Sequence, residues 1–248
     1  METNHMAKLQ NIPNITFTPA FFQFWGTTWL STVSSTPGKS KKANCFDRKQ
    51  AMDFGKALDP VVGNAIAQML GGIPVQTPSS QNALLPPAAD CVEVGDTRII
   101  GGVRPQNFDM VYRPDGVRIA YDSKTLNDAD SIKKNWQNMI NDIAAEATTL
   151  HTRFRYALAL FLVVVPEQAL NANQAEGLVH TLERMNERFG VDEENHKAES
   201  IALVVWNAST GNISNTIPNT KSSLRIEKYA KRIEEVYKSR YKGLPPHN

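Results

Sequence analysis

The sequence has few of the residues on which several kinds of site depend. Among its 248 residues there are only two cysteines, Cys45 and Cys91, and the five histidines are scattered along the chain. Neither residue type occurs at the spacing of a zinc or redox site, so the sequence favours neither kind of site. The glycine pairs at 71–72 and 101–102 lack the neighbouring residues of a phosphate-binding loop or a dinucleotide fingerprint.

Long hydrophobic runs and a secretory signal are also missing from the sequence. The most continuous apolar run, residues 156–165, is too short to span a bilayer as a helix. Without a secretory signal, we expect both cysteines to be reduced thiols in a cytoplasmic protein. The sequence therefore predicts a protein without membrane segments.

Charged residues are nearly balanced in number and unevenly spread. The 27 Lys and Arg residues and the 25 Asp and Glu residues give a formal net charge of +2. A nucleic-acid partner would therefore have to bind a local basic surface. Residues 9–38 and 60–89 contain no charged side chain. We interpret most of these two stretches as packing around the edge of a core, and the alternative is a surface that faces a subunit interface or DNA bases.

Predicted helices and strands alternate along the chain, which is typical of an α/β fold. Two apolar segments are predicted as strands buried on both faces, and such strands need helices on each side of the sheet. We expect a single domain over residues 1–248, with a core over about 47–206 and additions at 1–46 and about 223–242. The predicted elements are a helix over 47–70, strands over 91–103, 108–112, 117–124, 156–165 and 201–206, and helices over 132–150, capped by Asp130 or Ser131, 172–189 and 223–242.

Two acidic residues and one lysine lie on a predicted hairpin in the middle of the chain. Asp109 lies on its first strand, residues 113–116 have the chemistry of a tight turn, and Asp122 and Lys124 share one face of the returning strand. Asp109 can approach Asp122 across the hairpin, and two such carboxylates repel each other unless a cation lies between them. A hard cation such as Mg²⁺ suits these oxygen ligands. Lys124 can then orient or help to deprotonate an attacking water, or stabilise charge on a phosphate.

The pattern formed by Asp109 and by Asp122-Ser123-Lys124 resembles the motif of the PD-(D/E)XK nuclease superfamily, best known from type II restriction endonucleases. In that superfamily an Asp opens the motif, and an Asp or Glu precedes a Lys by two positions. The resemblance implies that Asp109 and Asp122 bind the metal, that the carbonyl oxygen of Ser123 is a further ligand, and that Lys124 is the catalytic lysine. It also implies a restriction-endonuclease-like core, in which an α-β-β-β-α-β order gives a central mixed β-sheet flanked by helices.

The motif departs from the superfamily pattern in its first half. The Pro that usually precedes the first Asp directly lies four residues upstream in this chain, as Pro105. For that reason Asp96 and Glu93 remain alternative first metal ligands.

The resemblance implies a function as well as a fold. The implied function is that of a Mg²⁺-dependent, sequence-specific endonuclease of a restriction system, which hydrolyses phosphodiester bonds of double-stranded DNA. Because palindromic sites require two-fold symmetry, a homodimer is implied too. Two alternatives stay open. One is another nuclease on the same core, for repair, phage defence or particular DNA structures, and the other is a non-catalytic DNA-binding relative.

Two groups of polar residues are candidate DNA contacts. The loop at 38–42 contains no acidic residue and can bind phosphates, although it can also be an ordinary flexible basic loop. The helix after the motif begins with two lysines. The candidates are Lys39, Lys41 and Lys42 in the loop, and Lys133, Lys134, Gln137 and Asn138 on the helix. On that helix we also expect Asp142 and Glu146 to be solvated, and His151 to be a helix-surface or core residue.

Overall fold

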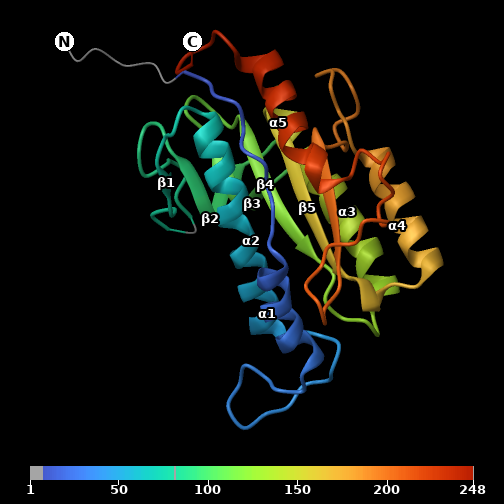
Figure 1. Cartoon of the computed structure of the whole chain (residues 1–248). Helices are drawn as coiled ribbons and strands as arrows, with labels where there is room; N and C mark the ends of the chain where they lie inside the picture. The colour runs from blue at the N-terminus through green and yellow to red at the C-terminus, as the bar shows by residue number, and fades with distance from the viewer. Residues whose placement is uncertain (1–7, 81, 248) are drawn as a thin grey trace.

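A six-stranded mixed β-sheet forms the centre of the molecule, as Figure 1 shows for the computed structural model. The structure describes residues 8–80 and 82–247. In sheet order the strands are β1 (Val75–Gln76), β2 (Val92–Ile100), β3 (Pro105–Tyr112), β4 (Ile119–Thr125), β5 (Leu158–Pro166) and β6 (Ser200–Trp206). The neighbours β2, β3 and β4 are antiparallel, whereas β4, β5 and β6 are parallel. The predicted α/β class with a central mixed sheet is confirmed.

Helices cover both faces of this sheet, as the two fully buried strands β5 and β6 require. The helices are α1 (Pro19–Leu30), α2 (Arg48–Met69), α3 (Ile132–Arg153), α4 (Ala172–Met185) and α5 (Ile226–Tyr241), with a short 3₁₀ helix over Glu167–Ala169. Figure 1 shows α2 and α5 on one face of the sheet, and α3 and α4 on the other. Within the described residues, none of these helices combines the length and the apolar character needed to cross a membrane.

Two local features shape the first part of the core. The first core helix, α2, begins after a capping box at Asp47 and continues through Pro60 without a break. The strand β2 has a register shift between Val94 and Thr97.

Two helix ends differ from the prediction. The helix α4 ends at Met185, so Phe189 lies outside it and is 54% exposed. Ser131 occupies the cap position of α3, but its side chain makes no capping hydrogen bond. Its Oγ atom instead donates to Asp128 at 2.7 Å and accepts a hydrogen bond from Nδ2 of Asn135 at 2.7 Å, so both bonds go to side chains.

The helix α1 lies in the uncharged stretch that we interpreted as packing at the edge of the core. Thr18 caps it by accepting a hydrogen bond from the N–H of Phe21, and Pro19 occupies its first turn. Gly26 brings α1 against the loop after β6, because a Cβ atom at this position would lie 1.8 Å from the carbonyl oxygen of Ala208. This part of the stretch packs on the core as a helix. The sequence did not predict the helix, because α1 has no charged residues that would distinguish an exposed face from a buried one.

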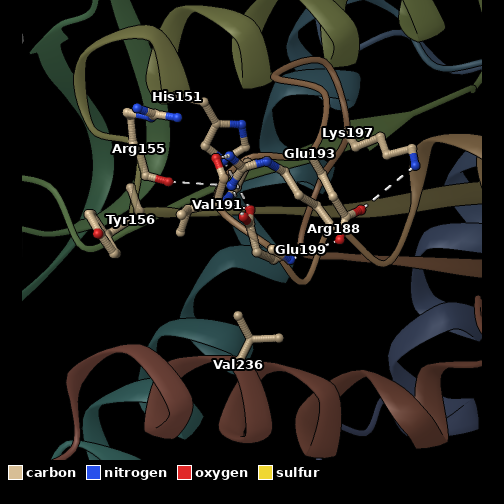
Figure 2. Close-up of polar contacts among 12 residues, drawn as sticks. His151, Arg155, Tyr156, Arg188, Val191, Glu193, Lys197, Glu199 and Val236 are labelled. Carbon is tan, nitrogen blue, oxygen red and sulfur yellow. Dashed lines mark hydrogen bonds and ion pairs between the residues drawn. The ribbon is translucent and has the colours of Figure 1, made fainter.

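A buried ion network around Glu199 ties the C-terminal end of α3 to the sheet and to α5, and Figure 2 shows part of it. The Oε1 atom of Glu199 accepts hydrogen bonds from Arg188 at 2.7 Å and from Arg240 at 2.8 Å. Its Oε2 atom accepts from the main-chain N–H of Ala159 at 2.7 Å and lies 3.1 Å from Nε2 of His151. Burial raises the pKa of Glu199, but these partners outweigh burial and hold the pKa below its ordinary value.

His151 is a core residue in this network. Its Nδ1 atom lies 2.9 Å from the carbonyl oxygen of Asn195, so both ring nitrogens face hydrogen-bond acceptors. The single carboxylate of Glu199 thus contacts two arginines and one histidine.

Candidate active site

The pairing between β3 and β4 ends one step before the predicted site. Met110 and Tyr121 form the last pair of this ladder, and the next positions in the same register are Asp109 and Asp122. The Oδ2 atom of Asp109 accepts hydrogen bonds from the main-chain N–H of Ser123 at 2.9 Å and from its Oγ atom at 3.0 Å. The Asp109 carboxylate thus accepts the hydrogen bond that a main-chain carbonyl group would otherwise accept from Ser123. These bonds anchor Asp109 to the strand that carries Asp122.

Lys124 is held between two carboxylates from different elements. Its Nζ atom donates to Oδ2 of Asp122 at 2.8 Å and to Oε1 of Glu146 at 2.9 Å. Asp122 and Lys124 share one face of β4, as the alternation of a strand predicts, and Glu146 reaches them from α3. The prediction that Glu146 is solvated is wrong, since only 6% of it is exposed. It lies beside Ile143 and Ala147, on the side of α3 that packs against the sheet.

The site holds more carboxyl groups than ammonium groups. Burial and the negative charge of Asp109 raise the pKa of Asp122 well above its ordinary value. Burial also raises the pKa of Glu146. For Lys124, burial lowers the pKa, but Asp122 and Glu146 outweigh it, so the pKa lies above its ordinary value and the side chain stays an ammonium ion. If all three carboxyl groups ionise, the single ammonium ion leaves an excess of negative charge, which a bound cation would offset.

Asp59 of α2 adds a further buried carboxyl group next to Asp109. Burial and, second, the negative charge of Asp109 raise the pKa of Asp59 to about 8, although the hydroxyls of Ser123 and Tyr121 act to lower it. The sequence patterns did not single out this residue. A signal was nevertheless present, because Asp59 precedes Val62 by three residues and so falls on the buried stripe of α2.

The raised pKa of Asp59 predicts how the stability of the metal-free protein depends on pH. Between the ordinary value of 3.8 and about 8, the folded protein keeps a proton on Asp59 that the unfolded chain releases. The free energy of unfolding therefore falls as the pH rises through this window. We expect Asp59→Asn, which cannot ionise, to melt at a higher temperature than the unaltered protein at the upper end of the window and at nearly the same temperature at the lower end.

Melting curves in EDTA across this pH window measure the effect. The matched control is Asp53→Asn, which changes an exposed carboxylate on the same helix and should keep the pH dependence of the unaltered protein. If Asp59→Asn keeps that dependence as well, the buried proton is not on Asp59.

The two alternative first ligands lie away from this group. Glu93 is fully buried and accepts two hydrogen bonds from Arg113, at 2.6 and 2.8 Å, so an arginine neutralises its charge. Asp96 is exposed in the register shift of β2. Among the three acidic candidates, Asp109 contacts the Asp122-Ser123-Lys124 strand, and the structure therefore favours Asp109 as the partner of Asp122.

The loop after α1 lies next to the start of α3. Nζ of Lys42 lies 3.1 Å from the carboxylate of Asp130, two residues before α3 begins. The N–H of Ala129, just before α3, donates to the carbonyl oxygen of Asn44 in the loop at 3.2 Å, and Nε1 of Trp29 in α1 donates to that of Asn127 at 2.7 Å. The two groups of candidate DNA contacts therefore lie at one end of the sheet, the end at which β4 leads into α3.

The candidate DNA contacts differ in their surroundings. The ammonium group of Lys41 turns into its own loop and donates to main-chain carbonyl oxygens, including that of Cys45 at 2.7 Å. Lys42 forms its ion pair at the surface, where it is 79% exposed. The side chain of Lys133 lies outside the described part of the structure. Lys39, Lys134, Gln137 and Asn138 are exposed. A role of these residues in DNA binding stays a prediction.

The donor set of the site fits a hard cation, although the described residues hold no group of three His, Cys, Asp or Glu side chains ready to bind a metal ion. Asp109 and Asp122 offer carboxylate oxygens, the ligands that Mg²⁺ prefers. The repulsion that raises the pKa of Asp122 is the interaction that a cation between the two groups would relieve. Comparisons with protein-family models, with curated proteins and with solved structures found no match to this chain.

Proposed function

We propose that this protein is a Mg²⁺-dependent, sequence-specific endonuclease that hydrolyses double-stranded DNA, as type II restriction enzymes do. The observation that carries the proposal is the group of Asp109, Asp122 and Lys124, in which two carboxylates follow the last pair of an antiparallel ladder and an ammonium lies 2.8 Å from one of them. The surrounding elements support it. The order expected for a restriction-endonuclease-like core is a helix, three antiparallel strands, a helix and a parallel strand. In this chain α2, β2 to β4, α3 and β5 follow that order.

Asp109 and Asp122 would hold the divalent cation, with the carbonyl oxygen of Ser123 as a further ligand. When bound, the cation supplies positive charge to the phosphate and promotes ionisation of the attacking water. The two hydrogen bonds from Ser123 fix the Asp109 carboxylate, so its orientation does not depend on the cation. Asp122, one strand away, completes a pair of hard oxygen ligands.

Lys124 acts in the proposed reaction as a charged hydrogen-bond donor. Its ammonium group has three N–H bonds, of which Asp122 and Glu146 take two. The third can hold the attacking water or a phosphate oxygen, and the positive charge stabilises the negative charge that develops in the transition state. Because an ammonium ion cannot accept a proton, we assign to Lys124 the orientation of water and not its deprotonation.

Double-stranded DNA would approach this group across the loop after α1 and the first turns of α3. The exposed side chains Lys39, Lys42 and Lys134 would contact phosphates there, and Gln137 and Asn138 would form neighbouring hydrogen bonds. A homodimer would place two such sites on the two strands of a palindromic sequence.

Digestion of plasmid and phage DNA in Mg²⁺, with EDTA as the control, tests the proposed function. We expect discrete fragments whose ends share one sequence, and no cleavage in EDTA. A smear of fragments, or cleavage confined to branched or damaged DNA, would instead favour another nuclease on the same core. Intact DNA at every Mg²⁺ concentration would contradict a nuclease function.

A further inference from the structure

Glu146 gives Lys124 a second carboxylate partner that lies outside the sequence motif. The two residues are 22 positions apart in sequence, and the distance from Nζ of Lys124 to Oε1 of Glu146 is 2.9 Å. Both side chains are largely buried, with 15% of the lysine side chain and 7% of the glutamate side chain exposed. A charge-assisted hydrogen bond in such surroundings is short, directional and only weakly screened by solvent.

Glu146 is itself held in place from β3. Nε2 of Gln106 donates to the same Oε1 atom at 3.2 Å, so the atom that receives Lys124 also receives a neutral donor from the strand of Asp109. The Oε2 atom is buried and has no hydrogen-bond partner within the described residues. A buried carboxylate oxygen without a partner is unfavourable. A residue that contributed only to folding would be better replaced by an apolar one, which points to a role for the carboxyl group of Glu146 in holding Lys124.

The second partner matters because Asp122 has two tasks. Its Oδ2 atom now accepts the hydrogen bond from Lys124, and the proposed cation site uses the same carboxylate. If Asp122 alone held the ammonium group, any turn of its carboxylate toward a cation would release Lys124. Glu146 is not on β4, so it can keep the ammonium group in place while Asp122 reorients.

We propose that Glu146 is a positioning residue, which holds the Lys124 ammonium group beside the scissile phosphate independently of Asp122. The inference rests on the proposed nuclease function and adds to it a residue from α3. In this role Glu146 touches neither the DNA nor the cation, and it acts through Lys124. Its removal should therefore slow the chemical step and leave the binding of DNA and of Mg²⁺ unchanged.

The test compares Glu146→Ala and Glu146→Gln with a control on the same helix. Asp142→Ala is the matched control, because Asp142 is an exposed acidic residue one turn before Glu146. Three quantities are measured for each full-length variant on supercoiled plasmid DNA. They are the single-turnover cleavage rate at saturating Mg²⁺, the Mg²⁺ concentration that gives half of that rate, and the dissociation constant for the DNA in Ca²⁺.

We expect Glu146→Ala to cut about 10- to 100-fold more slowly, as is found when a partner that orients a reacting group is lost. Glu146→Gln keeps an oxygen acceptor for Lys124 and should recover part of the rate. The half-saturating Mg²⁺ concentration, the DNA dissociation constant and the rate of Asp142→Ala should all match those of the unaltered protein. A normal rate in Glu146→Ala would overturn the inference. So would a rise in the half-saturating Mg²⁺ concentration in Glu146→Ala, because Glu146 would then be a metal ligand.

A double-variant cycle tests the contact without any cleavage assay. Melting temperatures are measured for Lys124→Met, Glu146→Ala and the protein that carries both changes. If the two side chains hold each other, the loss in the double variant will be smaller than the sum of the two single losses, and additive losses would overturn the inference. Failure of the proposed function is seen separately, as an unaltered protein that cuts no DNA, and the inference would fall with it.

Discussion

Replacing Lys124 with Met is expected to slow DNA cleavage by about 10²- to 10³-fold and to leave the affinity for DNA nearly unchanged. Methionine keeps most of the length of the side chain but carries neither the charge nor the N–H donors. The transition state of phosphodiester hydrolysis therefore loses a positive charge at a buried position, where solvent replaces it poorly. Binding of DNA uses many contacts on the surface, so the loss of one mostly buried ammonium group changes it little.

Single-turnover cleavage and DNA binding in Ca²⁺ measure the two effects separately. Lys231→Met is the control, because the Lys231 side chain is 81% exposed on α5 and forms an ion pair with Glu235 on the same helix. We expect this control to cut at the rate of the unaltered protein. Cleavage at an unchanged rate by Lys124→Met would show that the catalytic assignment is wrong, whatever the geometry of the site.

Replacing Glu199 with Ala is expected to lower the free energy of unfolding by about 3 to 5 kcal/mol. The substitution leaves the fully buried guanidinium group of Arg188 without its carboxylate partner, and it removes the partner of Arg240 and His151 as well. Removing one member of a buried ion network costs more than the pair contributes, because the remaining charges stay out of water. The end of α3 and the start of β5 lose their common anchor.

Urea unfolding followed by circular dichroism measures this loss. Glu199→Gln keeps the shape of the side chain and one oxygen acceptor, so we expect an intermediate value. Glu194→Ala, in an exposed part of the same loop, should leave the midpoint where it is in the unaltered protein. A Glu199→Ala protein with an unchanged midpoint would mean that the network does not contribute to stability.

Local patterns were sufficient to predict the strands β2 to β6 and the half of the candidate site that lies on them, but not the two-residue strand β1. The alternation of a strand places Asp122 and Lys124 on one face, and both contribute to the same hydrogen-bonded group. The apolar runs identify β5 and β6 as fully buried strands. These features depend on the order of neighbouring residues, which a sequence records directly.

The residues that complete the site come from helices and could not be placed in the same way. Glu146 was expected to be solvated, because a single acidic residue on a helix is most often exposed, and only the docking of α3 brings it to Lys124. Asp59 reaches the site through the packing of α2 near Ser123. The sequence predicts Lys41 as a DNA contact, whereas the fold of its loop surrounds its ammonium group with carbonyl oxygens. In each case the partner is distant in sequence or is a main-chain atom.

The central claim is that the paired carboxylates form the active site. It is tested most directly by the rates at which Asp109→Asn and Asp96→Asn cut supercoiled plasmid DNA in Mg²⁺. Asp109 contacts Ser123 next to Asp122, whereas Asp96 is exposed in the register shift of β2. A metal site built on Asp109 and Asp122 predicts that Asp109→Asn loses cleavage but still binds DNA, and that Asp96→Asn cuts like the unaltered protein. Normal cleavage by Asp109→Asn, or its loss in Asp96→Asn alone, would contradict that site.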